Sequence, residues 1–110
     1  MSLNILIFSS KEDIRSVCIE LKIKKLLMSI GAKRDVFFNK YDVSTVEGLS
    51  QAGIWEIGNI YPTIIIVDSN TEVARWRGEL PRLTELLPHL VCNENERLII
   101  SQTVYQKHRI

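Results

Sequence analysis

Residues 61–67 read Tyr-Pro-Thr-Ile-Ile-Ile-Val, and this stretch decides the fold. The β-branched run at 63–67 is typical of a strand at the centre of a sheet, buried on both faces. A proline directly before such a strand is unusual, because proline cannot donate a hydrogen bond to the ladder. A cis peptide bond at a turn accommodates it, and such bonds are nearly confined to proline. The stretch therefore predicts a central strand that follows a cis Tyr61–Pro62 bond.

The chain after this strand predicts an antiparallel hairpin. Residues 68–70 read Asp-Ser-Asn, which is typical of a tight turn, and residues 72–77 read as the returning strand. Two arginines flank Trp76 in this strand, and such interleaving can bind nucleic acid. Because strand faces alternate, we favour a charged edge strand in which Trp76 faces a helix while Arg75 and Arg77 face the other way.

A last helix is predicted at residues 81–90. Pro81 suits the first turn of a helix, where its missing N–H is not needed. Pro88 can end the same helix early, since proline disfavours helical backbone at the preceding residue.

The chain before residue 61 begins with a strand and a long helix. Residues 3–8 form a short apolar run that predicts a buried strand. Ser10 followed by Asp13 matches a helix N-terminal capping pattern, so the helix is expected over residues 11–30. Gly31 is a good C-terminal stop.

The apolar residues of this helix lie on two nearly opposite stripes. A helix covered on two sides and a helix kinked near Lys22 both fit this pattern, and both stay open. One stripe holds Ile14, Val17, Cys18 and Leu21; the other holds Ile19, Ile23, Leu26, Leu27 and Ile30.

A second strand and a second helix follow. Residues 35–41 read Asp-Val-Phe-Phe-Asn-Lys-Tyr and predict the strand. Ser44 with Glu47 matches a capping box at the start of the helix. One face of that helix is expected to hold Val46, Leu49, Gly53 and Ile57.

This order of elements predicts an α/β protein. Two strands joined by a helix pair in parallel through a right-handed crossover, and the hairpin adds an antiparallel strand. The result is a mixed four-stranded sheet with helices on both faces, formed by residues 1–90. Residues 91–110 are left as a C-terminal extension, which we expect to pack on the domain or on a second subunit because Leu98, Ile100 and Tyr105 are too apolar for a solvated terminus.

Composition agrees with one globular domain. The 110 residues are 45% hydrophobic and carry a net charge of +1, which argues against a strongly basic nucleic-acid binder and against disorder. Two cysteines are too few for a disulfide scaffold, and no apolar run approaches the roughly 20 residues that span a bilayer. The N-terminus lacks a signal-peptide pattern. We expect a cytoplasmic protein without membrane attachment.

The order of elements and the Tyr61-Pro62-Thr63 strand start resemble the thioredoxin-like superfamily. The family's cis-proline element is an apolar residue, Pro and Thr before a central strand, and its final strand ends in glycine, as residues 73–78 do here. The second strand also ends in an aspartate, Asp42, as it does in the family. The resemblance covers residues 3–90 and implies the thioredoxin-like fold.

The sequence departs from the family at the active site. Thioredoxins and glutaredoxins carry Cys-x-x-Cys or Cys-x-x-Ser where the first strand meets the first long helix, and here that window reads Asp13, Ile14, Arg15 and Ser16. A helix N-terminus lowers the pKa of a thiol at that place, but Asp13 has no redox chemistry. The family's tryptophan beside this window and the buried acid of its first strand are also missing. The resemblance therefore implies the scaffold without the usual catalyst.

Two further sites deserve a prediction. Cys18 lies on an apolar stripe, so we expect a small buried side chain; a reactive thiol is the alternative. His89 and Cys92 have a spacing that can touch one metal ion, but a structural zinc site needs four ligands, and only Cys18 and His108 remain to supply them. We predict no metal site and no cofactor.

Three classes of function stay open. We favour a non-enzymatic protein that binds or assembles with a protein or peptide partner through the cis-proline loop, at Tyr61, Pro62 and Thr63. The first alternative is an atypical thiol-redox protein of the thiol-disulfide oxidoreductase type that uses Cys18. The second is a glutathione- or peptide-binding protein without thiol chemistry. Nucleic acid and membranes are not expected as partners, and a homodimer stays open.

Overall fold

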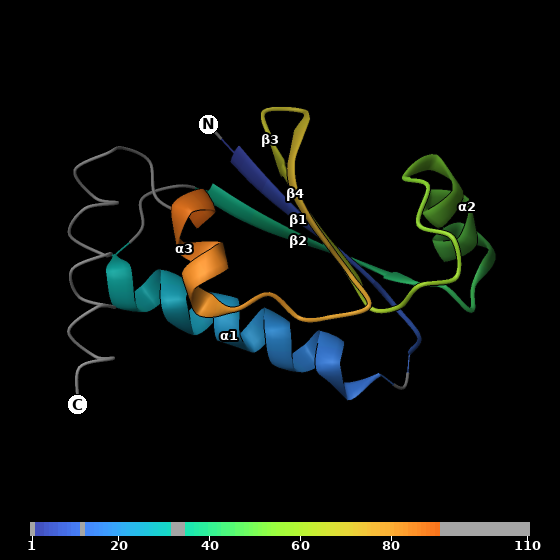
Figure 1. Ribbon diagram of the computed structural model, residues 1–110, viewed down its shortest axis with the longest axis horizontal. Helices are drawn as coiled ribbons and strands as arrows, with labels where there is room; N and C mark the ends of the chain where they lie inside the picture. Colours follow the sequence, from blue (N-terminus) through green and yellow to red (C-terminus); the bar gives the residue numbers. More distant parts are fainter. Residues whose placement is uncertain (1, 12, 32–34, 91–110) are drawn as a thin grey trace.

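The computed structural model describes residues 2–11, 13–31 and 35–90. In this part of the chain, four strands and three helices follow one another in the predicted order (Figure 1). None of these helices is both long and apolar enough to span a membrane. The bounds are β1 (Ser2–Ser9), α1 (Ile14–Ile30), β2 (Asp35–Asp42), α2 (Val46–Ile54), β3 (Thr63–Asp68), β4 (Thr71–Arg77) and α3 (Leu83–Leu90).

The strands form one mixed sheet in the order β2-β1-β3-β4. β1 pairs in parallel with β2 and antiparallel with β3, and β3 pairs antiparallel with β4. The central position of β3 explains its β-branched run, because five of its six residues are buried. The β3–β4 turn places Ser69 and Asn70 at positive φ angles of 51° and 69°, the backbone of a tight hairpin whose twist matches the strands. The predicted mixed sheet and hairpin are confirmed.

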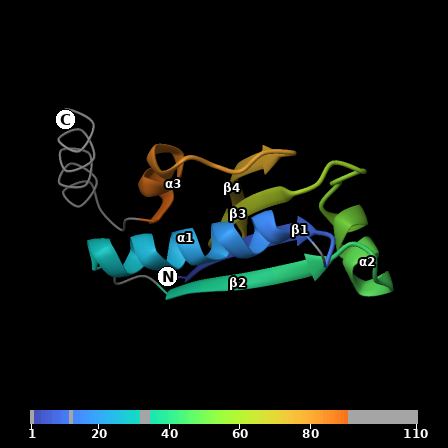
Figure 2. The same cartoon turned by 90° about the horizontal axis from the view of Figure 1, so that it is seen from below.

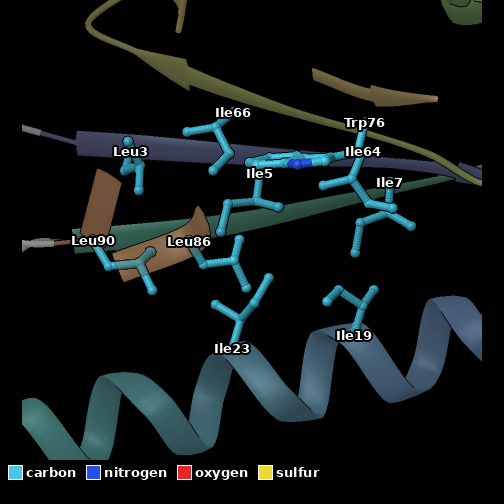
Figure 3. Close-up of a cluster of buried hydrophobic side chains, with 10 residues drawn as sticks. All are labelled: Leu3, Ile5, Ile7, Ile19, Ile23, Ile64, Ile66, Trp76, Leu86 and Leu90. Carbon is cyan, nitrogen blue, oxygen red and sulfur yellow. The ribbon is translucent and has the colours of Figure 1, made fainter. Parts of the chain in front are cut away.

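Helices cover both faces of the sheet, as predicted. α1 and α3 pack on one face, where Ile19 and Ile23 point from α1 towards the strands (Figure 3). α2 packs on the other face at one end of the sheet (Figure 2). The first core consists of Leu3, Ile5, Ile7, Ile19, Ile23, Ile64, Ile66, Trp76, Leu86 and Leu90, and the second of Leu6, Phe8, Val43, Ala52, Ile57, Ile65 and Val67.

α1 is a single helix that begins three residues later than predicted. Asp13, not Ser10, is its N-cap, because the Asp13 side chain accepts a hydrogen bond from the Arg15 backbone N–H. At its other end, Gly31 adopts the left-handed conformation, with φ of 61°, that the predicted stop requires.

Within the described part of the chain, one of the two apolar stripes of α1 is buried and the other is exposed. Ile19 and Ile23 are fully buried against the sheet, whereas Ile14, Val17 and Leu21 are 74%, 49% and 54% exposed. A sheet presents one flat face to a helix, so it buries one stripe and leaves the opposite stripe outside. The prediction that Cys18 is buried is therefore wrong: its side chain is exposed.

Charged groups join α1 to the edge strand β2. The Glu20 carboxylate pairs with Lys24 on α1 at 3.1 Å and with Lys40 on β2 at 3.0 Å. The Lys24 ammonium also lies 5.4 Å from the centre of the Phe38 ring. Partial burial raises the pKa of Glu20, but the hydrogen bonds from Lys40 and Lys24 outweigh it and hold that pKa below its ordinary value.

This arrangement predicts an acid-sensitive contribution to stability. Because the folded-state pKa of Glu20 is lowered, its contribution is complete above the unfolded pKa of about 4.3 and is lost as the pH falls through the folded value. We expect Glu20→Gln to lower stability at pH 7 by less than about 1 kcal/mol. Denaturant unfolding of both proteins at neutral and acidic pH checks this, and the difference between them should vanish in acid. A difference that is independent of pH would contradict the assignment to the charged pair.

The N-cap of α2 is Thr45, not the predicted Ser44. The Thr45 hydroxyl accepts a hydrogen bond from the Gly48 N–H at 3.0 Å, while the Ser44 hydroxyl donates to the Asp42 carboxylate at 2.6 Å. The buried face is correspondingly different from the predicted one. Gly48 and Ala52 are buried, and Val46, Leu49 and Ile54 are exposed.

α3 begins two residues later than predicted, at Leu83, and Pro88 lies inside it without ending it early. Trp76 packs in the core between β4 and α3, and its Nε1–H donates to the Glu85 carboxylate at 2.8 Å. The prediction that Trp76 faces a helix is confirmed, so its ring faces are not free to stack on a base. Arg75 on the opposite side of β4 pairs with Glu72. The predicted extension at 91–110 lies outside the described residues.

Candidate functional site

One end of the sheet brings together the segments that the sequence singled out (Figure 1). Phe8, near the end of β1, lies opposite Thr63 at the start of β3, and Ser9 lies opposite Asp42 at the end of β2. The Asp13–Ser16 window follows β1, and Tyr61 and Pro62 precede β3. The pairing of β1 with β3 therefore places both candidate segments at the same end of the sheet.

The first turn of α1 is closed by its own side chains. The Asp13 carboxylate accepts hydrogen bonds from the Arg15 N–H at 3.0 Å and from the Arg15 guanidinium, with Nε–Oδ1 at 3.1 Å and Nη2–Oδ2 at 3.0 Å. The buried Ser16 hydroxyl donates to the Asp13 carbonyl at 2.8 Å. A two-pronged pair of this kind is among the stronger side-chain contacts. Asp13, Arg15 and Ser16 are thus hydrogen-bonded to one another, and the fourth window residue, Ile14, is exposed.

The charges of the window neutralise each other. The hydrogen bond from the Arg15 side chain holds the pKa of Asp13 below its ordinary value, and the same hydrogen bond raises the pKa of Arg15. At neutral pH the pair is therefore fully ionised and has no net charge. Because its proton affinity is lowered, the Asp13 carboxylate is a weaker base than an unpaired aspartate.

The loop before β3 exposes little of the predicted site. The Tyr61–Pro62 bond is cis, and the Pro62 side chain is buried. Thr63 is also fully buried, and its hydroxyl donates to the Ile60 carbonyl at 2.7 Å. Of the three predicted binding residues, Tyr61 alone keeps part of its side chain at the surface, where its hydroxyl donates to the Gly58 carbonyl at 3.0 Å.

Two apolar side chains near this end of the sheet are exposed. Ile14 is 74% exposed and Ile60 is 42% exposed. No hydrogen bond among the described residues uses the backbone amide or carbonyl of Tyr61. Ile60 was not singled out by the sequence, although an apolar residue directly before a Tyr-Pro turn was a usable signal.

Asp42 organises the neighbouring turn. Its carboxylate accepts hydrogen bonds from the Ser44 hydroxyl at 2.6 Å and the Ser44 N–H at 2.9 Å. These two bonds, the side-chain one first, hold the pKa of Asp42 below its ordinary value. The Asp42 backbone carbonyl accepts from the Thr45 hydroxyl at 2.7 Å. The carboxylate that ends β2 is thus engaged in shaping the turn into α2.

Cys18 does not join these residues. It lines a groove on the α3 side of α1, with Leu21 and Leu83. Within the described ranges, no three His, Cys, Asp or Glu side chains gather to hold a metal ion, and every buried side-chain nitrogen or oxygen has a hydrogen-bond partner. Cys92 and His108, which completed the metal set weighed from the sequence, lie beyond residue 90.

Known proteins resemble this chain in structure and not in sequence. No protein-family model matches it, and no curated protein matches it. Thioredoxin from Fasciola hepatica superposes with a TM-score of 0.57 at 22% identity, covering 81% of each chain. Deadhead, a germline-specific thioredoxin of Drosophila melanogaster, gives 0.56 at 22% identity, covering 82% of each chain. Thioredoxin 1 from Thermosipho africanus gives 0.53 at 18% identity, covering 93% of this chain and 99% of that one. Superpositions of this extent show that the chain has a thioredoxin-like fold.

Proposed function

We propose that the protein is a non-enzymatic binding module that holds an extended peptide segment of a partner protein at the end of the sheet. The binding surface, here called the loop surface, consists of Ile14, Ile60 and the backbone of Tyr61. The observation that carries the proposal is the exposure of apolar side chains from two different segments, Ile14 and Ile60, at the end of the sheet that both segments share.

The loop surface suits a peptide better than a small polar ligand. Exposed apolar side chains gain free energy when a partner covers them, at about 25 cal/mol per Å². The unused amide and carbonyl of Tyr61 can pair with the main chain of an extended segment, as in strand addition. The ionised groups nearby already pair with each other, so they add no strong attraction for a charged ligand.

A peptide-binding measurement tests the proposal. Peptides selected from a random library on the immobilised protein are titrated against wild type, Ile14→Gln and Met28→Gln. Both changes replace an exposed apolar residue of α1, at 74% and 83% exposure, but Met28 lies at the other end of the helix. We expect Ile14→Gln to weaken binding about ten-fold, the loss of a buried contact at an interface, and Met28→Gln to leave it unchanged. Equal losses, or none, would refute the loop surface as the binding site.

A second candidate function rests on the exposure of Cys18. The Cys18 thiolate can attack the disulfide of oxidised glutathione or of a partner protein, which forms a mixed disulfide and releases the other sulfur as a thiol. The geometry favours it less, because Cys18 faces the α3 side of α1 and not the loop surface. Insulin reduction with a thiol donor separates the candidates: turnover above the donor alone that Cys18→Ser abolishes would favour the redox protein.

A further inference from the structure

Two exposed surfaces on different helices carry opposite charges. The first, here called the α1 groove, has a volume of about 480 Å³ and is lined by Leu21, Leu26 and Leu83 among others. Lys22 and Lys25 also line it, and neither forms an ion pair with another residue of the described ranges. The α1 groove is therefore apolar and has a basic rim.

The second surface, here called the α2 face, is apolar and acidic. Three large apolar side chains of α2 are more than half exposed: Val46, Leu49 and Ile54. Glu47, in the first turn, is the one charged residue of α2, and Glu56 is exposed in the turn that follows. Arg77 reaches this turn from β4, but its guanidinium donates to the Ile57 carbonyl. An exposed apolar patch that the fold leaves uncovered is typical of an interaction site.

We propose that the α2 face of one copy of this chain docks in the α1 groove of a second copy. Because α1 and α2 pack on opposite faces of the sheet (Figure 2), one copy cannot join its own two surfaces, and the contact forms between copies. The inference does not rest on the proposed function, since the loop surface shares no residue with either surface.

The two surfaces match in length and in charge. The groove follows α1 from Cys18 to Ser29, which is about 17 Å at 1.5 Å per residue, and the nine residues of α2 span about 14 Å. Docking covers the exposed apolar side chains of both helices. It also sets the carboxylates of the α2 face against the ammonium groups of the rim, and complementary charges of this kind select and orient a partner.

The same charges disfavour a symmetric dimer. Two α1 grooves in contact would oppose Lys22 and Lys25, near the middle of α1, with the same two lysines. Two α2 faces in contact would oppose Glu47 with itself. The contact therefore joins unlike surfaces, and each copy keeps one surface for a further copy. An arrangement of this type closes into a ring or extends into a chain.

Charge reversal tests the proposal in the full-length protein. Sedimentation equilibrium at concentrations up to about 1 mM compares wild type with K22E/K25E, with E47K/E56K and with the variant that combines all four changes. We expect each double variant to associate about ten-fold more weakly than wild type, because like charges then face each other. The combined variant should recover the association of wild type, since opposite charges face each other again and the net charge stays at +1.

A matched control separates the contact from the effect of net charge. The variant K22E/K25E/D35K/E79K also has a net charge of +1. Its new lysines lie at exposed positions outside both surfaces, at the start of β2 and after β4. Its association should stay as weak as that of K22E/K25E.

A substitution without a change of charge gives a second measure. Leu49→Gln removes an exposed apolar side chain of the α2 face, and Val73→Gln does the same on β4, outside both surfaces. We expect about ten-fold weaker association for Leu49→Gln, the loss of a buried contact at an interface, and no change for Val73→Gln. Thermal unfolding of each variant verifies that the fold is retained.

Three results would overturn the proposal. Wild type that stays monomeric at every concentration would show that copies of the chain do not dock. Double variants that associate as well as wild type would place the contact elsewhere. A combined variant that associates no better than its matched control would show that the α1 groove and the α2 face do not meet.

Discussion

Replacing both Asp13 and Ser16 by cysteine is expected to turn the protein into a disulfide reductase. The N-terminus of α1 is already built for a thiolate: position 13 is the N-cap, and the Arg15 guanidinium lies against the side chain there. Both the helix end and the cation lower the pKa of a thiol. Position 16 lies one turn further, where its side chain turns back to the position 13 backbone, a separation that a disulfide can bridge. We expect the rate of insulin reduction to rise about a hundred-fold over that of the thiol donor alone, since attack requires a thiolate.

Wild type and a displaced pair of cysteines are the controls. The wild-type chain should show no turnover above the thiol donor. The variant I14C/V17C has the same spacing one residue further along α1, but both side chains lie on the exposed stripe and away from the Asp13 cap. It should remain close to wild type. A D13C/S16C protein no more active than I14C/V17C would show that the Asp13–Ser16 window is not equivalent to the redox window of thioredoxins.

The second large effect is expected at Gly48. A Cβ atom built on Gly48 would overlap the backbone carbonyl of Asp42 and approach the Thr45 hydroxyl to 3.1 Å. Because the obstacle is backbone, relief requires moving α2 away from the end of β2. We expect Gly48→Ala to destabilise the protein by about 3 kcal/mol, at the upper end of what overpacking costs.

Gly53→Ala in the same helix is the matched control. Nothing lies within 4 Å of a Cβ at Gly53, so the substitution exchanges a poor helix former for the best one and should stabilise the protein by about 0.5–1 kcal/mol. Denaturant midpoints of the two variants should therefore move in opposite directions. A shift of the same sign and size in both would show that helix propensity, and not the contact with Asp42, decides the outcome.

Elements with a local cause were predictable from the sequence. The β-branched run at 63–67 identified the central strand, because no helix or exposed strand needs such a run. The Asp-Ser-Asn turn fixed the hairpin, since short polar residues tolerate the positive φ angles found at Ser69 and Asn70. Alternation placed Trp76 inward. The order of these elements then led to the mixed sheet.

Local patterns that had two solutions were decided by tertiary packing. Ser10 and Asp13 are both suitable N-cap residues for α1, and the turn after β1 makes Asp13 the N-cap. In the same way, Ser44 and Thr45 both suit the N-cap of α2, and the turn after β2 makes Thr45 the N-cap. Gly48 looked like a weak point of a helix. It is instead the residue that permits the close approach to Asp42.

By itself, the sequence determined the strands, the hairpin, the order of elements and the absence of a cysteine pair at Asp13 and Ser16, because each depends on neighbours along the chain. Only the tertiary structure decided which stripe of α1 is buried, that Thr63 is enclosed, and that Cys18 and Ile14 are exposed. Two apolar stripes on one helix are equivalent until a sheet packs against one of them. Burial is a property of what lies opposite a side chain, and that neighbour is distant in the sequence.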